Sequence, residues 1–88
     1  MQHLSHPEIV KRLKRAHGHL GSVITMIEEG RPCLDLAQQI HAVESAITNA
    51  KRELIHDHME HCLGDGVGSG GLSAKTALAE FKTLARYL

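Results

Sequence analysis

The residues best suited to chemistry lie in one short run, His56-Asp57-His58-Met59-Glu60-His61-Cys62. Five of these seven residues carry imidazole, thiol or thioether donors, which suit Cu(I), Zn(II) or Ni(II). His58 and Cys62 are four positions apart, so they share one face of a helix. The run lacks the two-histidine-plus-glutamate order of zinc proteases, so it does not predict hydrolysis. The alternative is a solvated polar helix end with a buried free cysteine.

Cys33 is the other of the two cysteines and precedes His58 by 25 residues. That separation is about 37 Å along a straight helix, so the two residues cannot meet within one chain. They can meet if two copies of the helix pack antiparallel, which predicts two equivalent metal sites in a two-fold dimer. Without this pairing, Cys33 is an ordinary residue at a helix start.

Two further histidines, His3 and His6, lie near the N-terminus. They could complete a site for Ni(II) or Co(II), which take more nitrogen ligands than Cu(I). The alternative is a frayed terminus with incidental histidines. The remaining three histidines have no ligand partner by spacing, and we expect them to be exposed or hydrogen-bonded at the surface: His17, His19 and His41.

A basic cluster is the second feature with chemical potential. Residues 1–22 hold four cations in five positions and one acid, Glu8, in a chain whose formal net charge is zero. Such a surface predicts phosphate contacts with nucleic acid, and the alternative is a solvated helix face. The candidate DNA-binding residues, including a smaller pair further along, are Lys11, Arg12, Lys14, Arg15, Lys51 and Arg52. No helix-turn-helix or zinc-finger pattern is present, so any contact is expected through assembled helix surfaces.

Apolar periodicity predicts the elements that carry these residues. Apolar residues repeat at spacings of four and three in two stretches, which is typical of amphipathic helices. Ser5 and Glu8 form a capping-box pattern, and Gly30 suits a helix stop, which together predict a helix over 6–29. Pro32 suits the entry of a second helix over 33–63. The two apolar series are Ile9, Leu13, Ala16, Leu20, Val23 and Ile27, and Leu36, Ile40, Val43, Ile47, Ala50 and Leu54.

Beyond these helices the composition changes. Residues 64–71 include five glycines and predict a flexible loop. A last helix is expected over 73–87, with one apolar face made of Ala77, Leu78, Phe81, Leu84, Ala85 and Leu88. No strand pattern is present, so the predicted fold is all-α. It has three helices in one domain, 1–88: a long α-hairpin and a short C-terminal helix, with an antiparallel dimer forming a four-helix bundle.

Length and composition limit the classes of protein. The 88 residues include one Phe, one Tyr and no Trp, so the core must be aliphatic and small, which favours an oligomer. No apolar stretch approaches the roughly 20 residues that span a bilayer, and no secretion signal opens the chain. We therefore expect a cytoplasmic protein with no membrane partner. No nucleophilic triad or phosphate-binding loop is present, so the sequence does not favour an enzyme.

Four segments resemble the CsoR/RcnR/FrmR family of bacterial transcriptional repressors, and the resemblance covers nearly the whole chain. They are residues 12–20 (RLKRAHGHL), 26–33 (MIEEGRPC), 38–43 (QQIHAV) and 58–62 (HMEHC). The resemblance implies an all-helical dimer of dimers that binds operator DNA through basic helical surfaces. It also implies that an inducer lowers DNA affinity and releases genes for metal efflux or detoxification.

The resemblance maps the family's sensing cysteine onto Cys33, its histidine onto His58 and its second ligand of that helix onto Cys62. This set is similar to that of copper sensors and of one type of nickel sensor. Nickel and cobalt members add an N-terminal histidine, here His3 or His6, although this chain is about two residues short before the family's first glycine motif. His19 replaces the usual Gln, and Pro32 stands where some copper sensors have Tyr.

The sequence therefore predicts a metal-responsive repressor whose inducer is Ni(II)/Co(II) or Cu(I), and the resemblance implies that it is a homotetramer. Its predicted ligands are Cys33, His58 and Cys62, with His3, His6 and His61 as further candidates. One alternative is a repressor of the same family that senses persulfide through Cys33 and Cys62, or formaldehyde through Cys33. Another is a small metal-binding chaperone or buffer that binds no operator.

Overall fold

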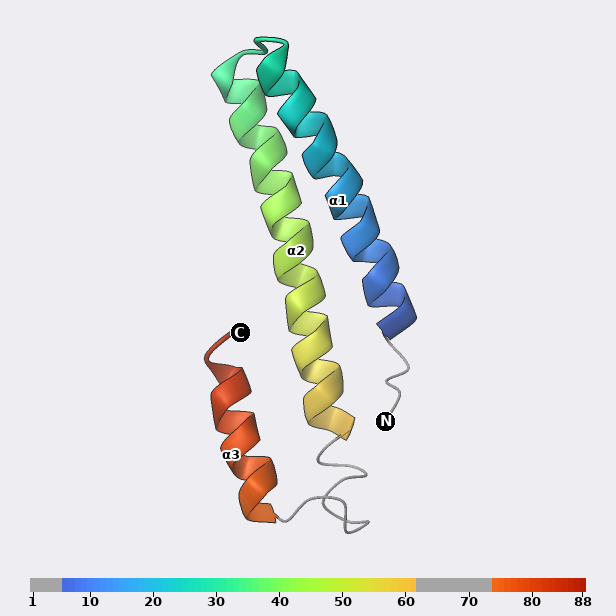
Figure 1. Cartoon of the computed structure of the whole chain (residues 1–88). Coiled ribbons are helices and arrows are strands. Elements are labelled where there is room, and N and C mark those ends of the chain that lie inside the picture. The colour runs from blue at the N-terminus through green and yellow to red at the C-terminus, as the bar shows by residue number, and fades with distance from the viewer. Residues whose placement is uncertain (1–5, 62–73) are drawn as a thin grey trace. The chain divides into compact units, whose positions relative to one another are not determined.

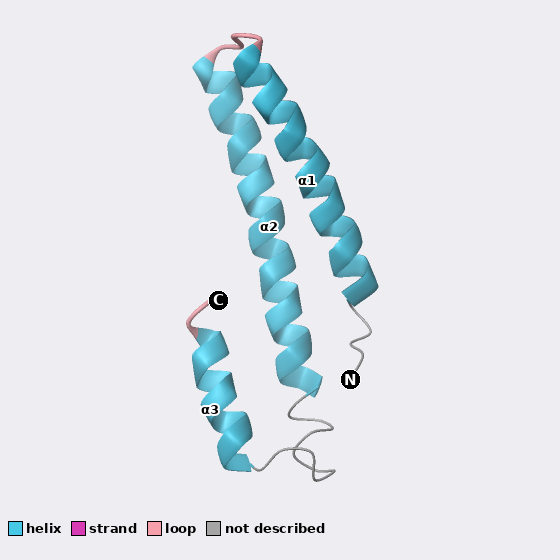
Figure 2. Ribbon diagram, in the orientation of Figure 1, coloured by secondary structure: helices cyan, strands magenta, loops and turns pink. Residues whose placement is uncertain are grey.

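A computed structural model describes residues 6–61 and 74–88, which form three α-helices and no strand (Figures 1 and 2). The helices are α1 (His6–Glu28), α2 (Cys33–His61) and α3 (Ala74–Ala85). All three predicted helices are confirmed, and their described ends lie within two residues of the expected ones. Ser5, proposed as a cap, and the glycine-rich loop 64–71 lie outside the described residues.

The chain divides into two compact units. The hairpin unit is Pro7–Ala50, and the terminal unit combines Met1–His6 with Lys51–Leu88. Within the hairpin unit, α1 and the first part of α2 lie side by side and run in opposite directions (Figure 1). The short turn at Gly30–Pro32 allows this arrangement, because it reverses the chain within a few residues.

Gly30 ends α1 in the way that the sequence predicts. Its φ is +77°, in the left-handed region that a residue without Cβ adopts at little cost. The amide of Gly30 donates to the Ile27 carbonyl at 3.0 Å, and the amide of Arg31 donates to the Met26 carbonyl at 3.1 Å. This pair of bonds is a Schellman motif, which satisfies carbonyls at the helix end. The Pro32 carbonyl then accepts the Leu36 amide at 3.1 Å, so α2 starts directly after the proline.

The core of the hairpin unit uses only every second member of each predicted apolar series. Its buried apolar residues recur every seven positions on each helix: Ile9, Ala16 and Val23 on α1, and Val43 and Ala50 on α2. The intervening residues Leu13, Leu20 and Ile27 are 43%, 42% and 50% exposed. Two helices touch along one line, so a single hairpin covers only part of each stripe.

The terminal unit buries Ile55 and Met59 of α2 and Ala77 of α3. Of the apolar face expected on the last helix, Leu78 and Leu88 are 55% and 48% exposed, so the chain covers only part of that face. The covered row of α3 is instead Ala77, Glu80 and Leu84, spaced by three and four. A carboxylate therefore lies within the covered face, beside α2.

None of the described helices is long and apolar enough to cross a membrane.

Candidate functional site

The best-defined polar contact of the terminal unit joins His58 of α2 to Glu80 of α3. Nε2 of His58 donates a hydrogen bond to Oε1 of Glu80, and the two side chains are 33% and 39% exposed. A carboxylate can only accept, so Nε2 carries a proton and the neutral ring has its lone pair on Nδ1. A carboxylate that holds one imidazole nitrogen in this way orients the other nitrogen as a metal ligand.

His58 also lines a cavity of about 210 Å³, the imidazole cavity. Its other lining residues are His6 at the start of α1, Leu54 and Ile55 of α2, and Leu84 of α3. Nε2 of His6 is buried. Two imidazoles from distant parts of the sequence therefore share one pocket with apolar walls. Such walls limit access of water, and nitrogen donors of this kind suit Ni(II), Co(II), Zn(II) or copper.

Cys33 is the first residue of α2, and its free thiol is exposed. It lies at the end of α2 opposite to His58, as the sequence predicts. Cys62 and His3 lie outside the described residues, and His61 is described only as the last residue of α2. Among the described residues, no three His, Cys, Asp or Glu side chains form a group that could hold a metal ion.

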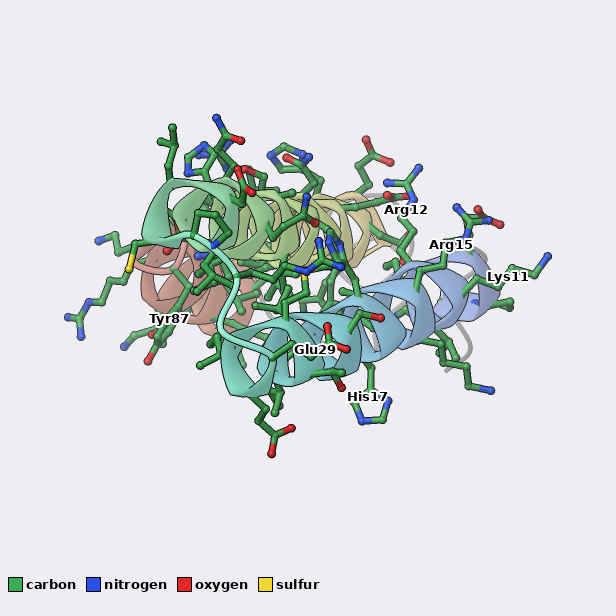
Figure 3. All side chains as sticks on the ribbon, turned by 90° about the horizontal axis from the view of Figure 1, so that it is seen from above. Lys11, Arg12, Arg15, His17, Glu29 and Tyr87 are labelled. Atoms are coloured by element: carbon green, nitrogen blue, oxygen red, sulfur yellow. The ribbon has the colours of Figure 1, made fainter. Side chains whose placement is uncertain are left out.

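The basic cluster occupies the exposed surface of α1. Lys11, Arg12, Lys14 and Arg15 are all exposed, and so are Lys51 and Arg52 on α2. Figure 3 shows Arg12 and Arg15 on the side of α1 that faces α2, whereas His17 points to the opposite side. The cations of α1 therefore do not form one uniform face, because two of them border the neighbouring helix.

Arg12 and Arg15 line a second cavity, the basic cavity, of about 300 Å³. Its remaining walls are Ala16 and His19 of α1 and Ala46 and Asn49 of α2. His19 is half-buried, and its Nε2 lies 2.6 Å from Oε1 of Gln39. An amide oxygen accepts, so the imidazole of His19 donates across from α1 to α2.

The other histidines of the hairpin unit lie at its surface, as expected. His17 is exposed. His41 is 78% exposed, and its Nδ1 lies 3.8 Å from Oε1 of Glu44 one helical turn on. Neither His17 nor His41 lines the imidazole cavity.

Sequence reasoning missed three residues that the structure places in these sites: Glu80, Gln39 and Asn49. Glu80 had a detectable signal, because it stands between Ala77 and Leu84 at helical spacing, where an apolar residue is the simpler choice. Gln39 and Asn49 had none, since polar residues on an exposed helix are unremarkable until a neighbour faces them.

Comparison with known proteins defines the class. Residues 5–86 match the family described as "Metal-sensitive transcriptional repressor". This match covers almost the whole chain, and the chain therefore belongs to this family of repressors.

Two curated relatives and one solved structure are similar to the chain. The copper-sensing transcriptional repressor RicR of Mycobacterium tuberculosis is 40% identical over 70 residues, which are 80% of this chain and 73% of RicR. The copper-sensing repressor CsoR of Bacillus subtilis is 40% identical over 63 residues, 72% of this chain and 62% of CsoR. The solved structure of the nickel-responsive transcriptional regulator InrS is 34% identical, with a TM-score of 0.83 over 100% of this chain and 98% of that one. All three are described as transcriptional repressors or regulators.

Proposed function

We propose that this chain is a DNA-binding repressor that leaves its operator when Ni(II)/Co(II) or Cu(I) binds, which releases metal-efflux or resistance genes. The observation that carries the proposal is the oriented imidazole of His58, held by Glu80 in a pocket that also contains His6. Family membership supports it, and similarity to copper-sensing and nickel-responsive regulators supports copper and nickel as inducers.

The proposed ligands are Cys33 of one chain with His58 and Cys62 of another. Cys33 and His58 lie at opposite ends of α2, so one copy of the helix cannot bring them together. Two thiolates and one imidazole suit Cu(I), and one or more additional imidazoles favour Ni(II) or Co(II). His6 is an additional candidate with described geometry, because it lines the same cavity as His58. His3 and His61 remain candidates of the same kind.

The exposed apolar residues of α1 and α2 support an assembly. Leu13, Leu20 and Ile27 on α1, and Ile40 and Ile47 on α2, are each between 42% and 50% exposed. A stripe of this length left in water is unfavourable, at roughly 25 cal/mol for each Å² of apolar area. A second copy packed antiparallel covers it and forms a four-helix bundle. Two such dimers form the proposed homotetramer.

The proposed operator contacts are the exposed cations Lys11, Arg12, Lys14 and Arg15 of α1, with Lys51 and Arg52 of α2. Exposed Lys and Arg side chains displace counterions from DNA phosphates, which favours binding. A metal shared between chains biases how the hairpins pack and thus the spacing of these cations. The coupling free energy expected for such a link is about 1–3 kcal/mol.

The test is an anaerobic titration of the full chain with Cu(I), Ni(II) and Co(II), with metal affinity and operator anisotropy measured together. Cys33→Ala should weaken metal binding and prevent release, whereas His17→Ala, on the far side of α1, should behave as the wild type. Metal affinity and release that survive Cys33→Ala would contradict the proposed site. Absence of any operator binding would instead favour a metal chaperone or buffer.

The exposed thiol of Cys33 favours one second candidate, a sensor of persulfide or formaldehyde. A persulfide sensor should form a dimer crosslinked between Cys33 and Cys62 on non-reducing gels after polysulfide treatment. Operator release that responds to chelators but not to reductants or aldehyde excludes this candidate.

A further inference from the structure

The basic cavity of the hairpin unit lies between two helices and is lined mainly by polar and charged side chains. Arg12, Arg15 and His19 recur at spacings of three and four on α1, and all three line the cavity with Asn49 of α2. Its floor includes Ala16, which is buried, and Ala46. Because alanine is small at both positions, α1 and α2 leave between them a hollow of about 300 Å³ instead of a filled contact.

The lining has the chemistry of an oxyanion site. Two guanidinium groups and one primary amide border the hollow, and none of its six lining residues is a carboxylate. A guanidinium presents its donors in a planar fork that matches phosphate oxygens. Two such forks at a spacing of three residues lie on the same side of a helix, so both can reach one group.

His19 acts in this cavity as a brace. Its Nε2 donates to Oε1 of Gln39 at 2.6 Å, so the neutral ring presents only an acceptor, Nδ1, elsewhere. It is therefore a positioning residue that ties α1 to α2 beside the two arginines. The anion donors are Arg12, Arg15 and the amide nitrogen of Asn49.

We propose that the basic cavity seats a single phosphate of the DNA backbone, shared by Arg12, Arg15 and Asn49, with His19 and Gln39 holding its walls. The proposal rests on the proposed operator binding and refines it, because it divides the basic cluster into two kinds of cation. Arg12 and Arg15 share one phosphate, whereas Lys11 and Lys14 do not line the cavity and contact DNA phosphates independently of each other. A phosphate contact positions the protein without reading sequence.

The experiment measures DNA affinity against salt concentration for the full chain and its variants. Each phosphate neutralised contributes about 0.9 to the slope of log K against log salt. Arg12→Ala and Arg15→Ala should each leave this slope nearly unchanged, because the remaining guanidinium still neutralises the shared phosphate, and only the double variant should lower the slope. This comparison does not depend on how many copies of the cavity touch DNA, since all variants share that number.

The matched control is the pair Lys11→Ala and Lys14→Ala. Their losses of slope should be additive, because these cations do not share a lining. Additive losses for the two arginines as well would overturn the proposal of one shared phosphate. If neither the wild-type chain nor any of its variants binds DNA, the proposed function is contradicted instead.

Neutral variants test the rest of the cavity. Asn49→Ala removes one hydrogen bond to a charged group and should weaken operator and random DNA alike by about tenfold, with the slope unchanged. His19→Ala should weaken binding, and His19→Gln, whose amide can still donate to Gln39, should restore it. Equal DNA affinity for Asn49→Ala and wild type, with an unchanged helical spectrum, would contradict the assignment.

The His19 ring resonances separate DNA from free anions as the source of the phosphate. Duplex DNA should shift them at micromolar concentration, and inorganic phosphate at matched ionic strength should do so only at far higher concentration. The opposite order, with inorganic phosphate effective and DNA without effect, would overturn the proposal in favour of a free-anion site.

Discussion

The two described cavities of this small chain both include residues of α2, yet their linings are chemically opposite. The basic cavity of the hairpin unit has two guanidinium groups, an imidazole and an amide around alanines. The imidazole cavity of the terminal unit has two histidines among leucine and isoleucine side chains. The first is suited to an anion at its surface, and the second to a metal ion in a site partly screened from water.

On the proposed function, one helix would contribute to the sites of two ligands. The hydrogen bonds follow the same division: His19 donates to a neutral amide and braces a wall, whereas His58 donates to a carboxylate and is oriented for coordination. The partner of the imidazole therefore distinguishes a structural histidine from a candidate ligand better than the residue type does. Variants that change one cavity should therefore alter the affinity for one ligand and leave the affinity for the other unchanged.

The largest expected effect follows removal of the oriented imidazole. His58→Ala should lower affinity for each inducing metal by about 100-fold or more, because it removes a ligand and not only its support. The matched control is His56→Ala, an exposed histidine two positions away on α2. Anaerobic competition titrations measure both. If His56→Ala causes the larger loss, the imidazole cavity is not the metal site.

Removal of the carboxylate behind His58 should have the next largest effect. Glu80→Gln keeps the shape of the side chain but removes the charge that orients the ring. The metal concentration that half-releases the operator should rise by about 10–100-fold. Glu60→Gln, at an exposed position of α2, serves as the control. Indistinguishable release curves for Glu80→Gln and wild type would show that the hydrogen bond has no part in sensing.

His6 tests which metals the imidazole cavity prefers. His6→Ala should lower Ni(II) affinity by roughly tenfold and leave Cu(I) affinity nearly unchanged, since Cu(I) is satisfied by fewer and softer ligands. Competition titrations give the affinities, and the Ni(II) absorption spectrum should change because a nitrogen ligand is lost. An equal loss of affinity for both metals, or no loss for either, would contradict a selective role for His6.

The smallest expected effect concerns the scaffold outside both cavities. Gly30→Ala places a Cβ at a φ of +77° and should lower the free energy of unfolding by about 1–2 kcal/mol. Gly18→Ala should raise it by about 0.5–1 kcal/mol, because a Cβ there meets nothing within 4 Å. Denaturant unfolding at fixed protein concentration measures both changes. A change in metal affinity caused by Gly30→Ala would mean that the hairpin turn and the metal site are coupled.

Much of this architecture could be predicted without coordinates. The three helices follow from apolar spacing, and the turn follows from Gly30 and Pro32, because backbone preferences of this kind act over only a few residues. The candidate metal ligands near the end of α2 and the cations of α1 could likewise be predicted from the types and positions of their residues. The sequence also indicates that Cys33 and His58 cannot meet in one chain, since a continuous helix separates them.

Other features needed the packed molecule. Leu13 and Val23 belong to the same periodic series, yet only Val23 is buried, at 1% exposure. The hydrogen bonds of His58 with Glu80 and of His19 with Gln39 span 22 and 20 residues of sequence, and no local pattern specifies them. The same is true of His6 beside His58 and of the arginines around Ala16 and Ala46. The sequence by itself determined the helices and the donor types, because both are local properties, while the tertiary structure decided which donors share a cavity, because that depends on how separate helices pack.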